Sequence, residues 1–306
     1  MGSQGEKPVR KPALQAKGPL HKKSDLLIRE MRVDDIPAAL RLCRLSGWNQ
    51  MEEDWRIFLR SNPNGSRLAE RDGEVVGTVA TIRYGDRFSW LSMLLVAPEE
   101  RGNGVGTRLL QEGLAILKSE RCCRLDATPA GRQLYRKHSF LEEYSLSRMT
   151  ATIDANRFTS APADTRPMRE SDLGEITCQD FEVFGSDRSG LLIDLYQRSP
   201  EYARVIEKNG HIAGYLFGRR GFLYDQLGPV IALSETDARR MVADCLRSHH
   251  GKHFAIDAQR FDPAWLSWLA ANGFTEERIL FRMYRGAHLY PGLPQRQFAI
   301  LGPEFG

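Results

Sequence analysis

The chain has no long apolar run, and this absence excludes a helical membrane span. Its longest apolar stretch, residues 91–98, has the length of a β-strand, whereas a spanning helix needs about 20 apolar residues. The N-terminus is basic and lacks the apolar core of a secretory signal. The sequence therefore predicts a cytoplasmic protein that does not bind membranes.

Cysteine is scarce and shows no metal-binding pattern. The five cysteines are scattered, and none forms a C-x-x-C pair. An odd, scattered set is typical of reduced thiols inside the cell, where small buried cysteines act as apolar residues. We expect no bound metal.

The positive charge of the chain is concentrated at its N-terminus. Five lysines and Arg10 against Glu6 give residues 1–24 a net charge of +5. Because the whole chain carries +4, the rest is almost neutral. A basic tail binds nucleic acid weakly, but this composition favours a solvated, disordered leader with no specific nucleic-acid partner.

The rest of the chain repeats itself once. Four blocks recur in the same order at offsets of 131 to 137 residues: 31–35 with 168–172, 73–77 with 210–214, 125–127 with 256–258, and 140–149 with 274–283. This predicts two structural copies. We divide the chain into a leader (1–24), a first domain (25–153), a linker (154–163), a second domain (164–285) and an irregular tail (286–306).

The first copy is predicted to be a mixed α/β domain. Strands are expected at 26–31, 67–70, 74–84, 88–97, 122–127 and 144–153, and helices at 34–45, 52–60, 104–119 and 131–138. Gly-containing turns between the second, third and fourth strands indicate an antiparallel meander. The predicted fold is a mostly antiparallel sheet flanked by helices, present twice.

The segment V-A-P-E-E-R-G-N-G-V-G-T, residues 96–107, is the most informative motif. An apolar strand ends, three glycines follow within five residues, and a helix begins. Such a loop directs several backbone N–H groups at one point, at the positive end of a helix. Glycine also lets phosphate oxygens approach the backbone. The motif predicts an anion site, above all for phosphate.

Two other interpretations of this loop remain open. One is a structural turn, although a single turn does not need three glycines. The other is a dinucleotide site, because Asp126 lies 20 residues past Gly106 at the end of the next predicted strand, where a ribose-binding acid would sit. The G-x-G-x-G spacing and the structure preceding the motif count against this interpretation.

Residues 101–106 also match R-x-x-G-x-G, which closely resembles the acyl-CoA loop of the GNAT (Gcn5-related) N-acetyltransferases. A second motif, L-Y-R-K-H-S-F at 134–140, resembles the ending of that family's domain, at a similar distance. The chain departs from the family pattern at Thr128, where an Asn is usual, and at Ser139, where a Gly is usual. The arrangement looks like that of bacterial two-domain GNAT proteins.

The resemblance implies specific roles. Backbone N–H groups of the loop would bind the CoA pyrophosphate: Arg101, Gly102, Asn103, Gly104, Val105, Gly106 and Thr107. Leu94, Leu95 and Val96 would pair with the pantetheine amides, and the Thr128 hydroxyl would replace the family's Asn. Tyr135 would donate a proton to the departing CoA sulfur. Its alternative is a core aromatic residue.

The acceptor side is less well marked. In the family's layout, acceptor contacts come from the loop between the first two helices, here Trp48, Asn49 and Gln50, although Trp48 could equally pack the two helices together. Asp126 is a candidate acceptor-site acid or, as readily, a cap. No general base is evident, and an ordered water would carry the amine proton.

The second copy lacks the motif. Residues 228–239 replace the loop without a glycine after Ala232, and about Ser267–Trp268 stand where Leu134–Tyr135 stand in the first copy. We interpret the second copy as a degenerate GNAT-like domain that closes the acceptor site or completes the sheet.

The sequence thus predicts an N-acetyltransferase that uses acetyl-CoA, without metal, to acetylate a primary amine of a small molecule or protein. The alternatives are a non-catalytic acetyl-CoA sensor and, less favoured, a dinucleotide-binding protein. The oligomeric state is left open, a homo-oligomer included.

Overall fold

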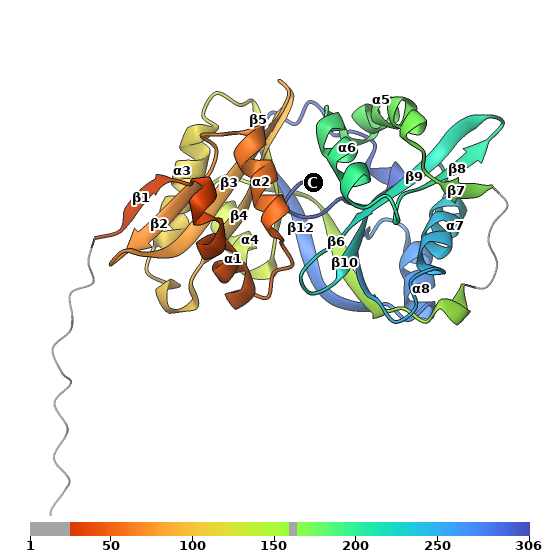
Figure 1. Cartoon of the computed structure of the whole chain (residues 1–306). Helices are drawn as coiled ribbons and strands as arrows, with labels where there is room; N and C mark the ends of the chain where they lie inside the picture. The colour runs from red at the N-terminus through yellow and green to blue at the C-terminus, as the bar shows by residue number, and fades with distance from the viewer. Residues whose placement is uncertain (1–24, 159–163) are drawn as a thin grey trace, which may run out of the picture.

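The structure, a computed structural model, describes residues 25–158 and 164–306. They form one sheet of thirteen strands with helices packed on it (Figure 1). The strand order is β1-β2-β3-β4-β5-β12-β6-β11-β13-β10-β9-β8-β7. The pairs β4–β5 and β10–β11 are parallel, and the other pairs are antiparallel. The predicted leader and residues 159–163 of the predicted linker lie outside the described residues.

The first half follows the predicted order of elements. Its strands are β1 (Leu27–Glu30), β2 (Arg67–Arg71), β3 (Glu74–Tyr84), β4 (Phe88–Val96), β5 (Cys122–Ala127) and β6 (Leu141–Thr152). Its helices are α1 (Ile36–Leu45), α2 (Glu52–Ser61), α3 (Val105–Ile116) and α4 (Pro129–Lys137). The antiparallel meander of β2, β3 and β4 is confirmed.

The second half repeats this order. Its strands are β7 (Thr165–Pro167), β8 (Arg204–Lys208), β9 (His211–Arg219), β10 (Asp225–Ala232), β11 (His253–Gln259), β12 (Thr275–Gly286) and β13 (Gln297–Ala299). Its helices are α5 (Leu173–Phe184), α6 (Ser189–Arg198), α7 (Glu235–Leu246) and α8 (Pro263–Ala271). Short 3₁₀ turns η1 (Val33–Asp35), η2 (Pro98–Glu100), η3 (Ala155–Arg157), η4 (Glu170–Asp172) and η5 (Pro294–Arg296) complete the chain.

The first repeated block is a helix-capping turn. Asp35 accepts a hydrogen bond from the backbone N–H of Arg32 before α1, and Asp172 accepts one from Arg169 before α5, both at 2.7 Å. Such a carboxylate satisfies a donor that the helix start leaves without a partner. The repeated residues therefore encode the same local structure in both halves.

The two halves exchange their long antiparallel strands. β12, from the second half, lies between β5 and β6, whereas β6, from the first half, lies between β12 and β11. This places Arg282 opposite Asp126 and Arg148 opposite Asp257. Each half thus completes the sheet of the other, as Figure 1 shows at the centre of the molecule.

The segment expected to be an irregular tail is partly a strand. β13 lies between β10 and β11, and the residues after it, 300–306, are buried apart from Pro303. A Cβ on Gly228 would collide with the carbonyl of Ile300, so this close approach requires glycine. The short apolar run F-A-I-L at 298–301, which follows a proline-rich stretch, gives too weak a periodicity to predict a strand.

The helices cover both faces of the sheet. The indole of Trp90 on β4 lies near Phe184 of α5, whereas a Cβ on Gly113 of α3 would lie 2.9 Å from Leu91. Because neighbouring strand residues point to opposite faces, α5 and α3 lie on opposite sides of the sheet. The main apolar core includes residues of both halves.

Candidate active site

β4 and β5 separate after a short paired stretch, and we call the gap between their unpaired edges the first cleft. These strands pair only at Ser89 with Cys123 and at Trp90 with Arg124. β4 continues to Val96, paired on its other edge with β3. Within the described residues no strand pairs with the β5-facing edge of residues 91–96, which include Leu94, Leu95 and Val96. Apart from the carbonyls of Met93 and Val96, which accept hydrogen bonds from Thr78 and Arg101, the backbone groups on this edge are available to an extended ligand.

A distortion of β4 marks the start of this free edge. Met93 has a positive φ of 53°, which is rare for a residue with a side chain. Thr78 on β3 donates a hydrogen bond to its carbonyl at 2.7 Å, and the β3–β4 register shifts here. Such bulges re-aim backbone groups and are common beside active sites.

The glycine loop follows β4 directly. Gly102 and Gly104 have φ of 79° and 81°, the left-handed region that glycine adopts without strain. A Cβ on either would meet no atom within 4 Å, so the space before them is open. α3 begins at Val105, and the first N–H groups of a helix, here through Thr107, have no partner inside it. The loop therefore presents a concentrated set of donors.

Arg101 holds this loop rather than extending from it. Its Nε donates to the carbonyl of Val96 at 3.1 Å, and Nη2 lies 3.3 Å from the hydroxyl of Ser46. Asn103 Nδ2 lies 3.5 Å from Glu100, which is buried and paired with Arg71. These side chains fix the loop's conformation and are themselves engaged in contacts within the protein.

Tyr135 lies on α4, which packs against β5 and β12. Its side chain is buried, and its ring packs edge-on against Phe140. Among the residues that the structure describes, none hydrogen-bonds its hydroxyl. Burial raises the pKa of Tyr135 above its ordinary value of 10, so the hydroxyl is a protonated donor at neutral pH. Thr128 caps α4 by accepting the N–H of Gly131 at 3.2 Å.

Asp126 is already engaged. Arg282 Nε and Nη2 donate to its two carboxylate oxygens at 2.9 and 2.8 Å, and both side chains are almost fully buried. Burial raises the pKa of Asp126, and the Arg282 guanidinium opposes the rise. Arg282 also donates to the Tyr144 hydroxyl at 2.8 Å. Accepting an amine proton would require Asp126 to give up this pair.

The loop between α1 and α2 faces the second half of the chain. Asn49 is buried; its Oδ1 accepts from the N–H groups of Leu223 and Tyr224, and its Nδ2 donates to the Tyr224 carbonyl. Gln50 is also buried, and its Oε1 has no hydrogen-bond partner in the described part of the chain. Trp48 is half-buried against the core. Of the three, Gln50 retains a free acceptor atom.

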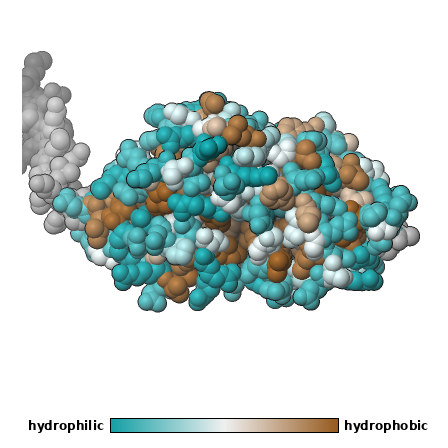
Figure 2. Space-filling model, turned by 90° about the horizontal axis from the view of Figure 1, so that it is seen from above, coloured by the Kyte–Doolittle hydropathy of each residue, from teal (hydrophilic) through white to brown (hydrophobic). Residues whose placement is uncertain are grey.

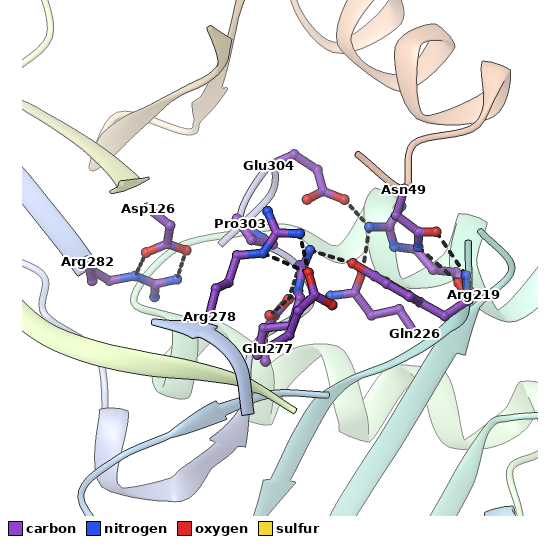
Figure 3. Close-up of polar contacts among 12 residues, drawn as sticks. Asn49, Asp126, Arg219, Gln226, Glu277, Arg278, Arg282, Pro303 and Glu304 are labelled. Atoms are coloured by element: carbon purple, nitrogen blue, oxygen red, sulfur yellow. Dashed lines mark hydrogen bonds and ion pairs between the residues drawn. The ribbon is translucent and has the colours of Figure 1, made fainter. Parts of the chain in front are cut away.

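Sequence reasoning missed a buried polar centre between the halves (Figure 3). Arg219 on β9 donates to Asp54 on α2 at 2.7 Å, to Gln226 at 2.9 Å and to Glu304. Gln226 in turn donates to Asp257 at 2.6 Å. The sequence carried no signal for Arg219 or Glu304, because neither belongs to a repeated block.

A second ion pair belongs to the same centre. Arg148 donates to both oxygens of Asp257 at 2.8 and 2.7 Å and to the Tyr224 hydroxyl at 2.8 Å. It is the repeat equivalent of the Arg282–Asp126 pair. Here a signal existed, because all four residues stand in repeated blocks.

The helix that follows β10 in the second half begins differently from α3, which follows β4 in the first half. α7 begins at Glu235, and the Ser234 side chain caps it by accepting the N–H of Asp237 at 3.2 Å. Glu235 and Asp237 place two carboxylates in the first turn, where α3 has none. The second half thus has a capped helix in place of the glycine cradle.

The tyrosine has no equivalent there either. α4 and α8 both begin with a proline, Pro129 and Pro263, which aligns Tyr135 with Leu269. The sequence comparison, which set about Ser267–Trp268 against Leu134–Tyr135, was therefore displaced by one residue. Leu269 is fully buried.

Two family models match the chain. The model described as "Acetyltransferase (GNAT) family" matches residues 31–140, and the model described as "Acetyltransferase (GNAT) domain" matches residues 176–299. The chain belongs to the GNAT superfamily. It is a tandem GNAT protein, with a mixed α/β fold and a mostly antiparallel sheet.

Known proteins resemble this tandem GNAT protein over most of its length. Holothin acyltransferase from Pseudoalteromonas sp. (strain SANK 73390) is 27% identical over 240 residues, 78% of this chain and 81% of that protein. "Uncharacterized N-acetyltransferase YitH" from Bacillus subtilis (strain 168) is 25% identical over 218 residues, 71% and 77% of the two chains. The family and these two names support acyl transfer as the chemistry of this chain.

Structural similarity agrees on the fold. A candidate acetyltransferase from Pyrococcus horikoshii, solved as a crystal structure, superposes with a TM-score of 0.77 at 20% identity. The match covers 95% of this chain and 100% of that one. At this identity the likeness shows the fold alone.

Hydrophilic residues cover most of the face shown in Figure 2. Apolar residues there form scattered spots on a largely hydrophilic face. Among the residues described, no helix combines the length and the hydropathy that crossing a bilayer requires.

Proposed function

We propose that this tandem GNAT protein transfers an acetyl group directly from acetyl-CoA to a primary amine, at one cleft in its first half. One observation carries the proposal. The free edge of β4, the glycine loop before α3 and Tyr135 on α4 belong to neighbouring elements, because α3 packs on β4, α4 packs on β5, and β4 pairs with β5. In the described part of the second half, the equivalent helix α7 starts with a serine cap instead of a glycine loop. The position equivalent to Tyr135 is the buried Leu269.

The residues present fit acetyl-CoA. The open space before Gly102 and Gly104 matches the approach of pyrophosphate oxygens. The N–H groups of Gly102 and of residues 104–107 would bind them, whereas the N–H of Asn103 already donates to the Glu100 carbonyl at 3.4 Å. The absence of acidic residues from the first turn of α3 leaves the positive end of the helix unopposed. The edge groups of Leu94, Leu95 and Val96 would hold the pantetheine amides as a strand would.

The chain's own groups then account for the transfer. Tyr135, kept protonated by burial, would donate its hydroxyl proton to the CoA sulfur as that sulfur leaves. Acetyl-CoA supplies the activated acyl group. Because Asp126 is tied to Arg282, the amine proton would pass to ordered water rather than to this carboxylate.

The acceptor would enter from the side of the cleft that the α1–α2 loop borders. Gln50, with its unpartnered Oε1, is the acceptor contact we propose from the original set, with Trp48 at the rim. Small amines and protein amines both remain candidates. Holothin, the acceptor in the name of one relative, belongs in the panel of amines to be tested.

Tyr135→Phe tests this function. We expect kcat for amine-dependent CoA release to fall about 100-fold, the size of a lost general acid, while the Kd of acetyl-CoA changes less than about twofold. Tyr290→Phe, at an exposed tyrosine, is the matched control and should leave both unchanged. Because the pKa of Tyr135 is raised, its protonation should not limit the rate below about pH 10.

Three outcomes would count against the proposal. Unaltered turnover in Tyr135→Phe would remove that residue from the mechanism. Acetyl-CoA binding without CoA release for any amine would favour the sensor. Calorimetric binding of NAD with none of acetyl-CoA would replace the function altogether.

A further inference from the structure

The gap between β4 and β5, the first cleft, has an equivalent in the second half between β10 and β11, called the second cleft. The two clefts differ in whether a strand lies inside them. After Trp90, β4 and β5 separate, and no described strand enters the gap. After Leu227, β10 and β11 separate in the same way, but β13 enters. Ala299 of β13 lies opposite Val230 of β10 and opposite Ala258 of β11. One strand of the chain itself therefore pairs with both walls of the second cleft.

The sheet register shows that β13 occupies the equivalent position. Leu95 lies opposite Thr78 in the first half, and Ile231 lies opposite Tyr215 in the second. Thr78 and Tyr215 are related by the repeat offset of 137. Ile231, which pairs with Gln297 of β13, is thus the counterpart of Leu95, whose free edge is assigned above to pantetheine.

We propose that residues 297–306 take, in the second half, the place that acyl-CoA takes in the first. The contacts of this segment with the first half would also hold in shape the root of the first cleft, the point at Trp90 where β4 and β5 stop pairing. The inference rests on the proposed function, which supplies the cofactor position. An inserted strand and a pantetheine arm satisfy the same backbone N–H and C=O groups of a strand edge. At the start of α7, Glu235 pairs with Arg239 and the buried Asp237 pairs with Lys208, so ion pairs stand where α3 presents its glycine loop.

Beyond β13 the segment reaches the first half. Ile300 donates its N–H to the Asp257 carbonyl at 3.1 Å. Further on, the indole Nε1 of Trp90 donates to the Pro303 carbonyl at 3.0 Å, and the Tyr84 hydroxyl donates to the Phe305 carbonyl at 2.7 Å. Two side chains of the first half thus hold the backbone that β13 anchors in the second.

Side chains of the segment add to this attachment. The Phe305 ring stacks on Phe58 of α2 with centroids 5.1 Å apart, and Glu304 pairs with Arg219, which also binds Asp54 of α2. Glu304 is buried, and burial raises its pKa. The segment is therefore fixed to α2 directly by the Phe305 ring and indirectly through Arg219, which bridges Glu304 and Asp54.

Trp90 is the residue through which the segment reaches the cleft. It is the last residue of β4 that pairs with β5. The guanidinium of Arg282, which holds Asp126, lies 4.7 Å from its ring centroid. A displaced segment would free the indole at the point where the two strands separate. Trp90 and Phe305 are thus positioning residues for the acceptor side of the cleft.

Binding stoichiometry tests the first part of the proposal. Calorimetry of the full chain with acetyl-CoA should give one site per chain. Hydrogen exchange should slow at residues 91–107 on binding and stay unchanged at 228–239. Two sites, or protection at 228–239, would overturn the inference while leaving the proposed function intact. No binding at all would overturn both the function and the analogy drawn from it.

Trp90→Phe tests the second part, because it removes the hydrogen bond to Pro303 and keeps an aromatic ring. We expect amide exchange of residues 88–92 to accelerate about tenfold and the KM for the acceptor to rise more than kcat changes, with the Kd of acetyl-CoA unaltered. Phe305→Ala should act alike, whereas Leu289→Ala, at an exposed residue, should not. Unchanged exchange, or a uniform increase across both halves, would overturn the positioning role.

Discussion

The two halves of this protein keep the same buried ion pair but not the same helix start. Asp126 with Arg282 and Asp257 with Arg148 occupy equivalent places, each joining a strand of one half to the exchanged strand of the other. The helix that follows β4 begins after open glycines, whereas the one that follows β10 begins with a serine cap and two carboxylates.

This contrast separates what holds the fold from what performs chemistry. The ion pairs lie at the strand exchange, where a lone buried charge would be strongly destabilising, so both halves need them. The glycine loop, which we propose as an anion site, adds no strand to the sheet, so one half can lack it. The comparison predicts that a change at the cradle acts in one half only, and that a change at an ion pair acts in both.

Gly106→Glu should produce the largest difference between the halves. A Cβ at Gly106 would make ordinary contact with Val96 at 3.5 Å, and a glutamate there would add a negative charge to the first turn of α3, where we propose that phosphate binds. We expect acetyl-CoA affinity to fall about 1000-fold or more, equivalent to about 4 kcal/mol. Thr236→Glu, at the exposed equivalent position of α7, should leave the affinity unchanged.

Calorimetry on the two variants checks this prediction. Residual binding in Gly106→Glu at one site per chain would mean that the second cleft binds the cofactor. A loss of affinity in Thr236→Glu would have the same meaning. Gly106→Ala, with a short apolar side chain, should show an intermediate loss and confirm that the effect comes from the cradle.

Arg282→Met and Arg148→Met should destabilise the protein to a similar extent. Each leaves a buried aspartate without its guanidinium, which costs about 3–5 kcal/mol. Urea unfolding at equilibrium, monitored by circular dichroism, measures the loss in free energy of unfolding. A loss in only one variant would show that the two pairs, although equivalent in the repeat, do not carry equal weight in the fold.

Paired replacement separates the structural from the local role of these ion pairs. Arg282→Met with Asp126→Leu should regain most of the lost stability, because an apolar pair of similar volume replaces a buried ion pair at little cost. If the pair also shapes the cleft root, this stable double variant should still have a reduced kcat.

The sequence predicted the elements of the first half and the strand-to-helix glycine loop, because these depend on local signals. Turn glycines, Pro37 in the first turn of α1 and the strand-to-helix glycine run act over a few residues. The strand exchange could not be predicted, since the register of β12 beside β5 is set by contacts about 150 residues apart in the chain. The repeat of Asp126 and Arg282 indicated their importance but not that they meet.

Local signals predicted the glycine loop of the candidate site but not the contacts that its other residues make with distant parts of the chain. The loop residues stand together in sequence, so their common site could be inferred. Asn49 was expected at the acceptor site, but its three hydrogen bonds reach the loop between β9 and β10, a partner that no local pattern reveals. Glu304 and Arg219 meet across 85 residues, and neither carries a motif.

The smallest expected effect concerns the capping aspartates, where the halves should again agree. The Arg29 side chain hydrogen-bonds Asp35 and lowers the pKa of that carboxyl, and Arg166 does the same for Asp172. A carboxyl whose pKa is lower in the folded state contributes stability above its unfolded pKa and loses it as pH falls through the folded pKa. Asp35→Asn and Asp172→Asn should each lower stability at pH 7 by about 1 kcal/mol or less and make the decline below about pH 5 shallower. Because the two sites share no partner, the double variant should show the sum of the two effects. Urea unfolding between pH 7 and pH 4 measures each contribution, and a pH dependence that changes in only one variant would show that the two turns, alike in geometry, differ in energy.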